Sequence, residues 1–306
     1  MSLSKLRIAT RKSLLALWQA EHIAQKISAV WPQIDIELVP MVTSGDRFAN
    51  DKTLPESGKG LFVKELETAL LDNRADIAVH SMKDVPAAFP DGLGIQTITT
   101  RDNPYDAFVS HQYASIEALP LNARIGTSSL RRQSQLLLMR PDLNIEVVRG
   151  NIHTRLEKLR STPFDGIILA AAGLMRMDLQ AQISEIIPKH LMLPACGQGA
   201  LGVEARLNDK EIQTLLASIH DQNTALCVST ERHVNAKLGG NCHVPVAVYC
   251  HLEQTQLELQ AKVLTADGQH HIDATCSGTA DTATQMADRC AQELFDKGAK
   301  ELLQCL

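Results

Sequence analysis

The sequence predicts an α/β protein of two similar lobes with mainly parallel sheets, followed by a smaller α+β domain. Over roughly the first 200 residues, short apolar runs alternate with segments of helical periodicity, a pattern typical of parallel sheets covered by helices on both faces. The design of residues 7–14, a strand, a small residue, Thr and a Ser-led helix, recurs at 124–130. After about residue 220, a long helix leads into alternating runs that favour an α+β unit.

In the first lobe, each expected element has a local cause. Ser13 can cap a helix that Trp31-Pro32 ends. The polar stretch 43–60 contains Ser44-Gly45, Pro55 and two further glycines, so it is predicted to be a mobile loop and a candidate lid. The expected strands and helices are, in order, 5–10, 13–30, 34–42, 61–71 and 76–79.

The second lobe repeats this alternation, and its last strand is expected to run into a turn at Ala171-Ala172-Gly173. Residues 194–206 are expected to form a return segment with a glycine-rich turn. Two similar lobes facing a cleft are the simplest arrangement. The expected elements of the second lobe are a helix over 129–139, a strand over 144–148, a helix over 152–160 and a strand over 166–170.

The third domain is expected to contain a helix over 222–238, strands over 244–251 and 257–265, and a helix over 281–297. A Gly-Gly-Asn-Cys loop follows its first helix. The predicted domains are 1–99 with 200–219, then 100–199, then 220–306.

Composition excludes several classes of protein. The formal net charge of −5 argues against nonspecific attraction to nucleic acid or anionic lipid. No apolar run approaches the roughly 20 residues that a membrane span needs, and the amino terminus lacks Ala-x-Ala cleavage chemistry, so a soluble, unsecreted protein is expected. Seven cysteines without a C-x-x-C pair indicate a reducing compartment, so the expected location is the cytoplasm.

Positive charge gathers at three predicted helix amino ends: Arg11 before Ser13, Arg131 and Arg132 after Ser129, and Arg149 before Asn151. A cation at this end of a helix costs roughly 0.3–1 kcal/mol unless an anion binds there. Amides, hydroxyls and arginine forks together can bind carboxylate or phosphate. The alternative is that these arginines face water. Three such places at corresponding lobe edges favour an anion pocket, with Arg155 and Arg176 as further candidates.

The segment HSMKDVP, residues 80–86, follows the strand expected at 76–79, at the edge where α/β sheets bind ligands. Asp84 could stabilise a cation or transfer protons, while Lys83 binds a substrate acid. An ordinary turn with a local ion pair is the alternative. No G-x-x-x-x-G-K-[ST], G-x-G-x-x-G or G-x-S-x-G element is present, which disfavours nucleotide phosphates and serine hydrolase chemistry.

Cys242 lies in a loop after Gly239 and Gly240, which let the backbone turn tightly and present a thiol. Most unpaired cysteines are instead buried small hydrophobes. A metal site made by Cys242-His243 with Cys250-His251 lacks the usual short ligand spacing, so no metal is expected.

Several long motifs, in order over nearly the whole chain, resemble the porphobilinogen deaminase family. HSMKDVP and GTSSLRRQ are chemically unusual, which makes chance agreement improbable. The motifs are RIATRKSLLALWQ (7–19), GKGLFVKELE (58–67), HSMKDVP (80–86), RDNPYDAFV (101–109), RIGTSSLRRQSQL (124–136), RGNIHTRLEKL (149–159), LPACGQGALGVEAR (193–206) and GGNCHVP (239–245). Asn241 departs from the family, which more often has two glycines directly before the cysteine.

The resemblance implies a fold and an activity. The first two domains should resemble the lobes of periplasmic binding proteins. The enzyme should be a monomeric transferase of heme biosynthesis that joins four porphobilinogen molecules head to tail, with loss of ammonia, into hydroxymethylbilane. The chain should grow on a dipyrromethane cofactor bound to Cys242 through a thioether.

The resemblance also implies residue roles. Asp84 should be the catalytic carboxylate, which steadies positive pyrrole nitrogens and the azafulvenium cation and assists proton transfer. The residues expected to bind the cofactor, besides Cys242, are Ser81, Lys83, Thr127, Ser129, Arg131 and Arg132. Those expected to bind substrate are Arg11, Ser13, Gln19, Lys59, Arg149, Arg155, Arg176 and Gln198.

Two other functions fit part of the sequence. A non-catalytic two-lobed module that binds a small dicarboxylate would explain the arginines and the repeated lobes, but it leaves Asp84, the Cys242 loop and the third domain without a purpose. A metal-dependent enzyme would require the Cys/His pairs to converge.

Overall fold

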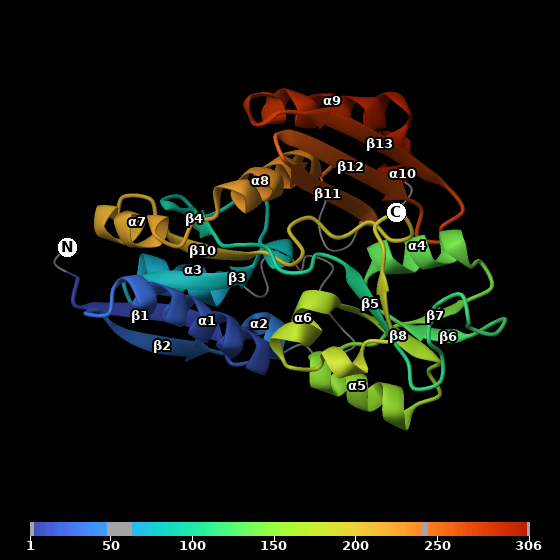
Figure 1. The fold of residues 1–306 in the computed structure, drawn as a ribbon, viewed down its shortest axis with the longest axis horizontal. Helices are drawn as coiled ribbons and strands as arrows, with labels where there is room; N and C mark the ends of the chain where they lie inside the picture. The colour runs from blue at the N-terminus through green and yellow to red at the C-terminus, as the bar shows by residue number, and fades with distance from the viewer. Residues whose placement is uncertain (1–2, 48–62, 240–243, 305–306) are drawn as a thin grey trace. The chain divides into compact units, whose positions relative to one another are not determined.

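The computed structural model describes residues 3–47, 63–239 and 244–304, and it contains three β-sheets with flanking helices (Figure 1). Contacts divide the chain into two compact units, Met1–Arg101 with Ala200–Ala225, and Asp102–Gly199 with Leu226–Leu306. The first unit contains one five-stranded sheet, and the second contains the other five-stranded sheet and a three-stranded sheet. The predicted division into three domains stays a prediction.

The sheet of the first unit has the order β2-β1-β3-β10-β4. Strand β1 pairs in parallel with β2 and β3, whereas β10 is antiparallel to both β3 and β4. Four strands therefore share one direction. The strands are β1 (Lys5–Arg11), β2 (Asp35–Met41), β3 (Ile77–Ser81), β4 (Leu93–Ile98) and β10 (Leu201–Arg206). The helices are α1 (Leu14–Val30), α2 (Ser44–Arg47), α3 (Lys64–Leu71) and α7 (Lys210–Ala217), with a 3-10 turn over Met82–Asp84.

Both faces of this sheet are covered, as the sequence predicts. Apolar side chains of β1, β3 and β10 pack against α1 and α7, and Ile23 of α1 and Leu215 of α7 are fully buried there. On the other face, Leu66 and Leu70 of α3 pack against Ala78. Ser13 caps α1, since its hydroxyl accepts a hydrogen bond from the Ala16 amide.

The five-stranded sheet of the second unit has the order β7-β6-β8-β5-β9, with β5 antiparallel to both of its neighbours. The repeated motif therefore occupies the same position in both sheets, because β1 and β6 are each second from an edge and each precede a helix. The strands are β5 (Asp106–Val109), β6 (Arg124–Gly126), β7 (Asn144–Glu146), β8 (Gly166–Ala170) and β9 (Glu185–Ile187). The helices are α4 (Leu130–Met139), α5 (Ile152–Ser161) and α6 (Ala171–Arg176), with a 3-10 turn over Gln180–Gln182.

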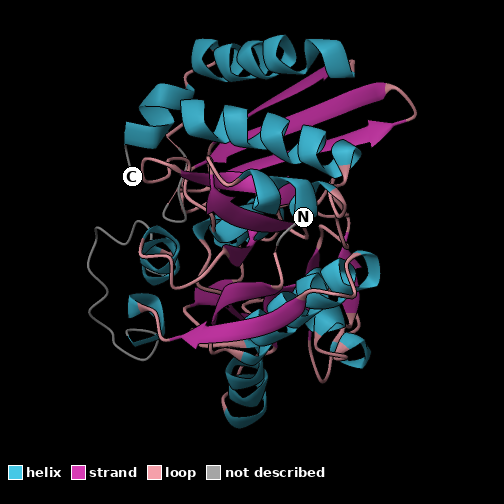
Figure 2. Cartoon of the chain, turned by 90° about the vertical axis from the view of Figure 1, so that its left-hand side faces the viewer, coloured by secondary structure: helices cyan, strands magenta, loops and turns pink. Residues whose placement is uncertain are grey.

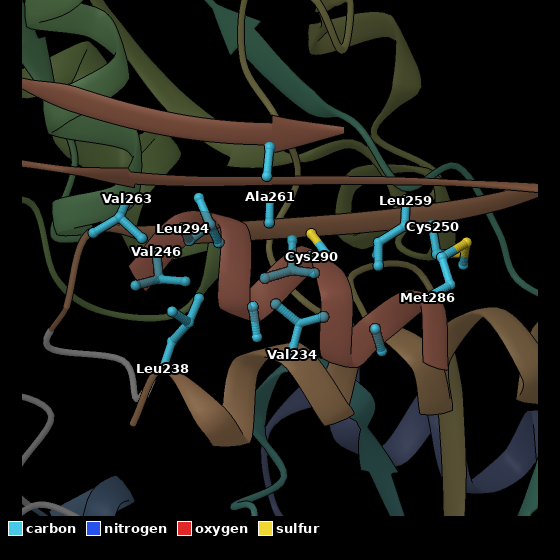
Figure 3. Packing of buried hydrophobic residues seen from close by; sticks show 14 of the residues in the cluster. Val234, Leu238, Val246, Cys250, Leu259, Ala261, Val263, Met286, Cys290 and Leu294 are labelled. Atoms are coloured by element: carbon cyan, nitrogen blue, oxygen red, sulfur yellow. The ribbon is translucent and has the colours of Figure 1, made fainter. Parts of the chain in front are cut away.

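The three-stranded sheet is an antiparallel meander of order β11-β12-β13. Figure 3 shows side chains of β11, β12, α8 and α9 meeting in one apolar core, among them Val234, Val263 and the fully buried Cys290. Its elements are α8 (Gln222–Lys237), β11 (Val246–Glu253), β12 (Gln256–Leu264), β13 (His271–Gly278), a 3-10 turn over Ala280–Thr282, α9 (Ala283–Asp296) and α10 (Ala299–Gln304). Helices line the strands throughout the described chain (Figure 2), which confirms the predicted fold class.

Three local expectations are wrong. Residues 44–47 form α2 rather than loop, and the rest of the expected loop, 48–60, lies outside the described residues. Ala171-Ala172-Gly173 opens α6 rather than a turn, because these small residues pack into the interior beside Leu174. His80 and Ser81 belong to β3, since they pair with Gly202 and Leu201 of the distant strand β10.

In the described part of the chain, no helix is long and apolar enough to cross a membrane.

Gly166 tests how closely the second unit is packed. A Cβ at this position would lie 2.2 Å from the ring of Phe108, which is fully buried. Gly166→Ala should therefore lower the free energy of unfolding by about 1–3 kcal/mol, measured by urea denaturation. Gly94→Ala is the control, because its Cβ would meet only the end of the half-exposed Leu207 side chain. Equal losses in both variants would contradict this account.

Candidate active site

The carboxyl end of β3 is anchored on several sides. Gln19 of α1 donates its side-chain amide to the Ser81 hydroxyl at 2.9 Å. The Met82 amide donates to the Ala200 carbonyl at 3.0 Å, and the Met82 side chain is buried. The 3-10 turn then leaves Lys83 half-buried and Asp84 exposed. A fixed turn thus presents a carboxylate next to an ammonium group.

Strand β1 ends at the same edge of the sheet, because β1 and β3 are parallel. Arg11 is its last residue, and Ser13 opens α1 directly afterwards. Of the expected first-unit residues, the structure brings Gln19 and Ser81 into direct contact and places Arg11, Ser13, Lys83 and Asp84 at this edge. Carboxyl ends of strands are where open α/β sheets bind ligands.

In the second unit, Arg131 and Arg132 surround a buried carboxylate that the sequence analysis did not single out. Arg131 donates to both Asp106 oxygens, at 2.8 and 3.2 Å, and to the Leu193 carbonyl at 2.8 Å. Arg132 donates through Nε to Asp106 at 2.9 Å and to the Ile168 carbonyl at 3.0 Å. Gln198 also donates to Asp106, at 3.1 Å. The two guanidinium groups are therefore held rigidly in the interior.

Electrostatics keep Asp106 ionised. Complete burial alone would raise its pKa, but the charges of Arg131 and Arg132 and the hydrogen bonds from Arg131 and Gln198 outweigh that effect and hold the pKa far below its usual range. Two cations around one anion leave one net positive charge in this buried group.

Arg176 and Gln198 meet at the glycine-rich segment that follows Cys196. Arg176 donates to Asp102 at 2.8 Å and to the Gly199 carbonyl at 2.7 Å, and burial lowers its pKa despite the Asp102 charge. Gln198 donates to the Pro104 carbonyl at 2.7 Å. Gly199 has φ +89°, and a Cβ there would lie 2.7 Å from the Asp102 carbonyl, so only glycine fits.

The starts of α4 and α5 supply further donors. Thr127 is buried and accepts a hydrogen bond from the Ser129 amide at 3.2 Å. Ser129 is half-exposed at the amino end of α4, where its side chain makes no capping bond within the described chain. Asn151 caps α5, and Arg155 donates to the Gly150 carbonyl at 2.8 Å. None of α1, α4 and α5 has an acidic residue in its first turn, so their amino ends suit anions.

Two of the expected site residues lie outside the described part of the chain, and the residues of the alternative metal site lie within it only in part. Lys59 and Cys242 lie outside the described residues. Within 3–47, 63–239 and 244–304, no group of three or more His, Cys, Asp or Glu side chains could hold a metal ion. Cys250 is buried in the core shared with α9.

The sequence analysis missed Asp102 and Asp106, although both lie in RDNPYDAFV. A carboxylate that opens the short apolar strand β5 was the available signal, because a buried charge requires partners. Which cations would supply them could not be read from the chain, since Arg131 lies 25 residues away.

Two five-stranded α/β sheets carry cations and hydroxyls at their strand ends. Together with the sequence matches that follow, they place the chain among the cofactor-dependent transferases. Residues 6–214 match the family model described as porphobilinogen deaminase, dipyromethane cofactor binding domain, and residues 225–296 match that of the C-terminal domain. The chain belongs to the porphobilinogen deaminase family.

Close relatives agree over the full length. A porphobilinogen deaminase from Legionella pneumophila strain Lens is 57% identical over 307 residues, covering 100% of this chain and 99% of the relative. The one from strain Philadelphia 1 is 58% identical with the same coverage. Among solved structures, the methionine binding protein MetQ is similar with a TM-score of 0.46 and 12% identity, covering 75% of this chain and 95% of that one. A YaeC-family lipoprotein from Enterococcus faecalis has a TM-score of 0.43 and 13% identity, covering 76% and 96%.

Asp106→Asn should destabilise the protein strongly. The substitution leaves two buried guanidinium groups without their counter-charge, which costs about 3–5 kcal/mol near pH 7, measured by denaturant unfolding. Because the folded pKa of Asp106 is depressed, its contribution is present above the unfolded pKa of about 3.9 and declines below it. The difference between wild type and variant should therefore narrow as the pH falls from about 5 toward 3.

Asp102→Asn is the matched control, because Asp102 also pairs with a buried arginine but is about half exposed (49%). Asp102→Asn should lower the free energy of unfolding clearly less than Asp106→Asn does. If Asp106→Asn cost no more than this control, the two arginines would not depend on the buried carboxylate.

Proposed function

We propose that this chain joins four porphobilinogen molecules head to tail, with loss of ammonia, into hydroxymethylbilane on a dipyrromethane primer held by Cys242 as a thioether. The agreement with porphobilinogen deaminases over the full chain carries this proposal. The described site fits it, because a primer and product rich in acetate and propionate groups require many fixed cations and anion-binding amides.

The proposed chemistry depends on Asp84. When bound, the dipyrromethane supplies the nucleophilic carbon to which the first substrate unit adds. The exposed Asp84 carboxylate, on its anchored turn, stabilises the cation that remains on the substrate after ammonia leaves. It also accepts the proton that the attacking ring carbon would lose after the new bond forms, which would restore the aromatic ring. Because the turn is fixed before substrate arrives, little reorganisation is needed.

The other residues bind carboxylates. Lys83, with the Ser81 hydroxyl that Gln19 orients, serves the cofactor at the end of β3. In the second unit Thr127, Ser129 and the start of α4 have the same role, and Arg131 and Arg132 contribute positive charge that Asp106 holds in place. Substrate carboxylates are proposed to bind Arg11, Ser13, Gln19, Lys59, Arg149, Arg155, Arg176 and Gln198.

The proposal also covers the oligomeric state, the cellular location and the partners of the protein. We infer a monomer in the cytoplasm that binds neither nucleic acid nor membrane. The net charge of −5 supports the absence of nucleic acid binding. Among the described residues, the cysteines 196, 227, 250, 276 and 290 form no disulfide, as expected in a reducing compartment.

The primer gives a direct test of Cys242. The denatured wild-type protein should show an intact mass that exceeds the chain mass by two linked pyrrole units, and Cys242→Ser should remove this excess because a hydroxyl is a poorer nucleophile than a thiolate. Cys250→Ser is the control and should retain it. A fully active wild-type chain without the added mass would exclude a covalent primer, and a dicarboxylate-binding module would then gain support.

Asp84→Ala should lose turnover by about 10²–10³-fold or more while it folds and keeps the cofactor mass, because a group that acts on transition-state charge affects kcat. Steady-state formation of hydroxymethylbilane measures the loss. Asp91→Ala, which removes another exposed carboxylate of the first unit, should leave turnover close to wild type. Similar kcat values in the two variants would remove Asp84 from the mechanism.

A further inference from the structure

An acid–imidazole cluster lies beneath the end of β3, on the sheet face that α3 covers. His80 of β3 and Glu204 of β10 are joined by a hydrogen bond of 2.9 Å between Nε2 and Oε2. Glu67 of α3 is the third member and is also buried (8% exposed). His80 pairs in register with Gly202, and Glu204 with Ala78, so both side chains point to the same face.

Apolar side chains line this face, together with Arg206 of β10, which is bonded to the Leu70 and Ala75 carbonyls and to Asp209. Ala9 of β1, Leu66 and Leu70 of α3, Ala78 of β3 and Leu93 of β4 form the hydrophobic cluster on this face. The titratable groups whose charges act on Glu67 are His80 from β3 and Glu204 from β10. Two carboxyl groups in such a layer cannot both ionise cheaply, because each buried charge loses its hydration and the two repel each other.

One oxygen of the cluster lacks a donor. Glu204 is 1% exposed, and its Oε1 has no hydrogen-bond partner among the described residues. An unsatisfied buried carboxylate oxygen is expensive. Burial, together with the Glu204 charge, raises the pKa of Glu67, while His80 opposes this shift. A proton on Glu67 would remove the repulsion between the two carboxylates.

The cluster is close in sequence and structure to the proposed catalytic turn. His80 immediately precedes Ser81, which Gln19 binds, and Met82, whose amide is bonded to the Ala200 carbonyl. His80–Glu204 is thus the third link that fixes the end of β3 before Asp84, and it joins that end to β10 from the side of α3.

We propose that Glu67, His80 and Glu204 form a positioning cluster for Asp84, in which the Glu204 carboxylate binds His80 and the buried Glu67 carboxyl is the group that takes up a proton. The assignment of Asp84 rests on the function proposed above, whereas the protonation of Glu67 does not. These are positioning residues, because none of them is required to touch the substrate.

The protonation of Glu67 is tested by stability against pH. An acid whose folded pKa lies above its unfolded value of about 4.3 loses stability as the pH rises through that interval. Glu67→Gln copies the protonated form and cannot suffer this loss. As the pH rises above about 4.3, the wild-type midpoint temperature should therefore fall relative to that of Glu67→Gln, by on the order of 2–4 °C. Glu21→Gln, at an exposed site on α1, should follow the wild type. If the midpoint temperatures of Glu67→Gln and wild type changed in parallel with pH, Glu67 would not take up the proposed proton and this part of the proposal would be wrong.

The positioning role is tested with Glu204→Gln, which keeps the shape but removes the charge that His80 binds. Hydrogen exchange of the Met82 and Val85 amides, which bond to Ala200 and Met82 carbonyls, should become faster. The kcat should fall on the order of 10- to 100-fold with little change in KM, because misplacement of a catalytic group mainly affects the chemical step. Glu204→Asp should restore part of the loss.

Asp76→Asn is the control, since Asp76 precedes β3 at its other end and pairs with Arg7 at 2.7 Å. It should destabilise the unit without changing exchange at Met82 and Val85 or kcat. Equal exchange and equal kcat in Glu204→Gln and this control would overturn the positioning role. If wild type formed no hydroxymethylbilane, the proposed function would fail, and the exchange rates would still decide whether the cluster fixes the turn.

Discussion

The second unit is organised around one buried carboxylate. Asp106 is fully buried and receives hydrogen bonds from Arg131, Arg132 and Gln198. Arg131 and Arg132 lie on α4, Gln198 lies in the glycine-rich segment, and Asp106 itself opens β5. Transfer of a charged group from water into the protein interior is tolerated only when opposite charge and hydrogen bonds surround the group there. The same contacts therefore fix the fold and the orientation of two arginines that the family resemblance assigns to the cofactor.

Both units contain buried carboxyl groups, and each unit stabilises them by different chemistry. In the second unit, an ionised carboxylate organises two guanidinium groups. In the first unit, Glu204 pairs with His80, and the proton proposed for Glu67 would reduce the remaining negative charge. In both cases the buried polar group lies close to a strand end that carries proposed ligand-binding residues. Asp84 is exposed there in the first unit, and Ser129 is half-exposed in the second. The rigid interior thus supports a site that is proposed to bind many carboxylates.

Asp84 and the contacts that fix its turn show how an exposed reactive group is held by buried neighbours. The carboxylate is exposed, but the residue two positions earlier, Met82, is buried and bonded to Ala200. Gln19 approaches Ser81 from α1, and Glu204 approaches His80 from β10. A reactive side chain on a short turn is therefore held by contacts from α1, from β10 and from Ala200, the residue that precedes β10.

The sequence by itself determined the α/β class, the repeated strand-helix motif, the Ser13 and Asn151 caps and the family, because periodicity, capping and long motifs are local properties of the chain. It could not decide that β10 enters the sheet between β3 and β4 and thereby extends β3 through His80 and Ser81. Nor could it show that Asp106 pairs with both Arg131 and Arg132, or that Glu67 and Glu204 are buried on the same side of the sheet, where the Glu204 charge acts on Glu67. These outcomes depend on contacts between residues far apart in the chain, and on how burial changes the energy of a charge, which only the tertiary structure decides.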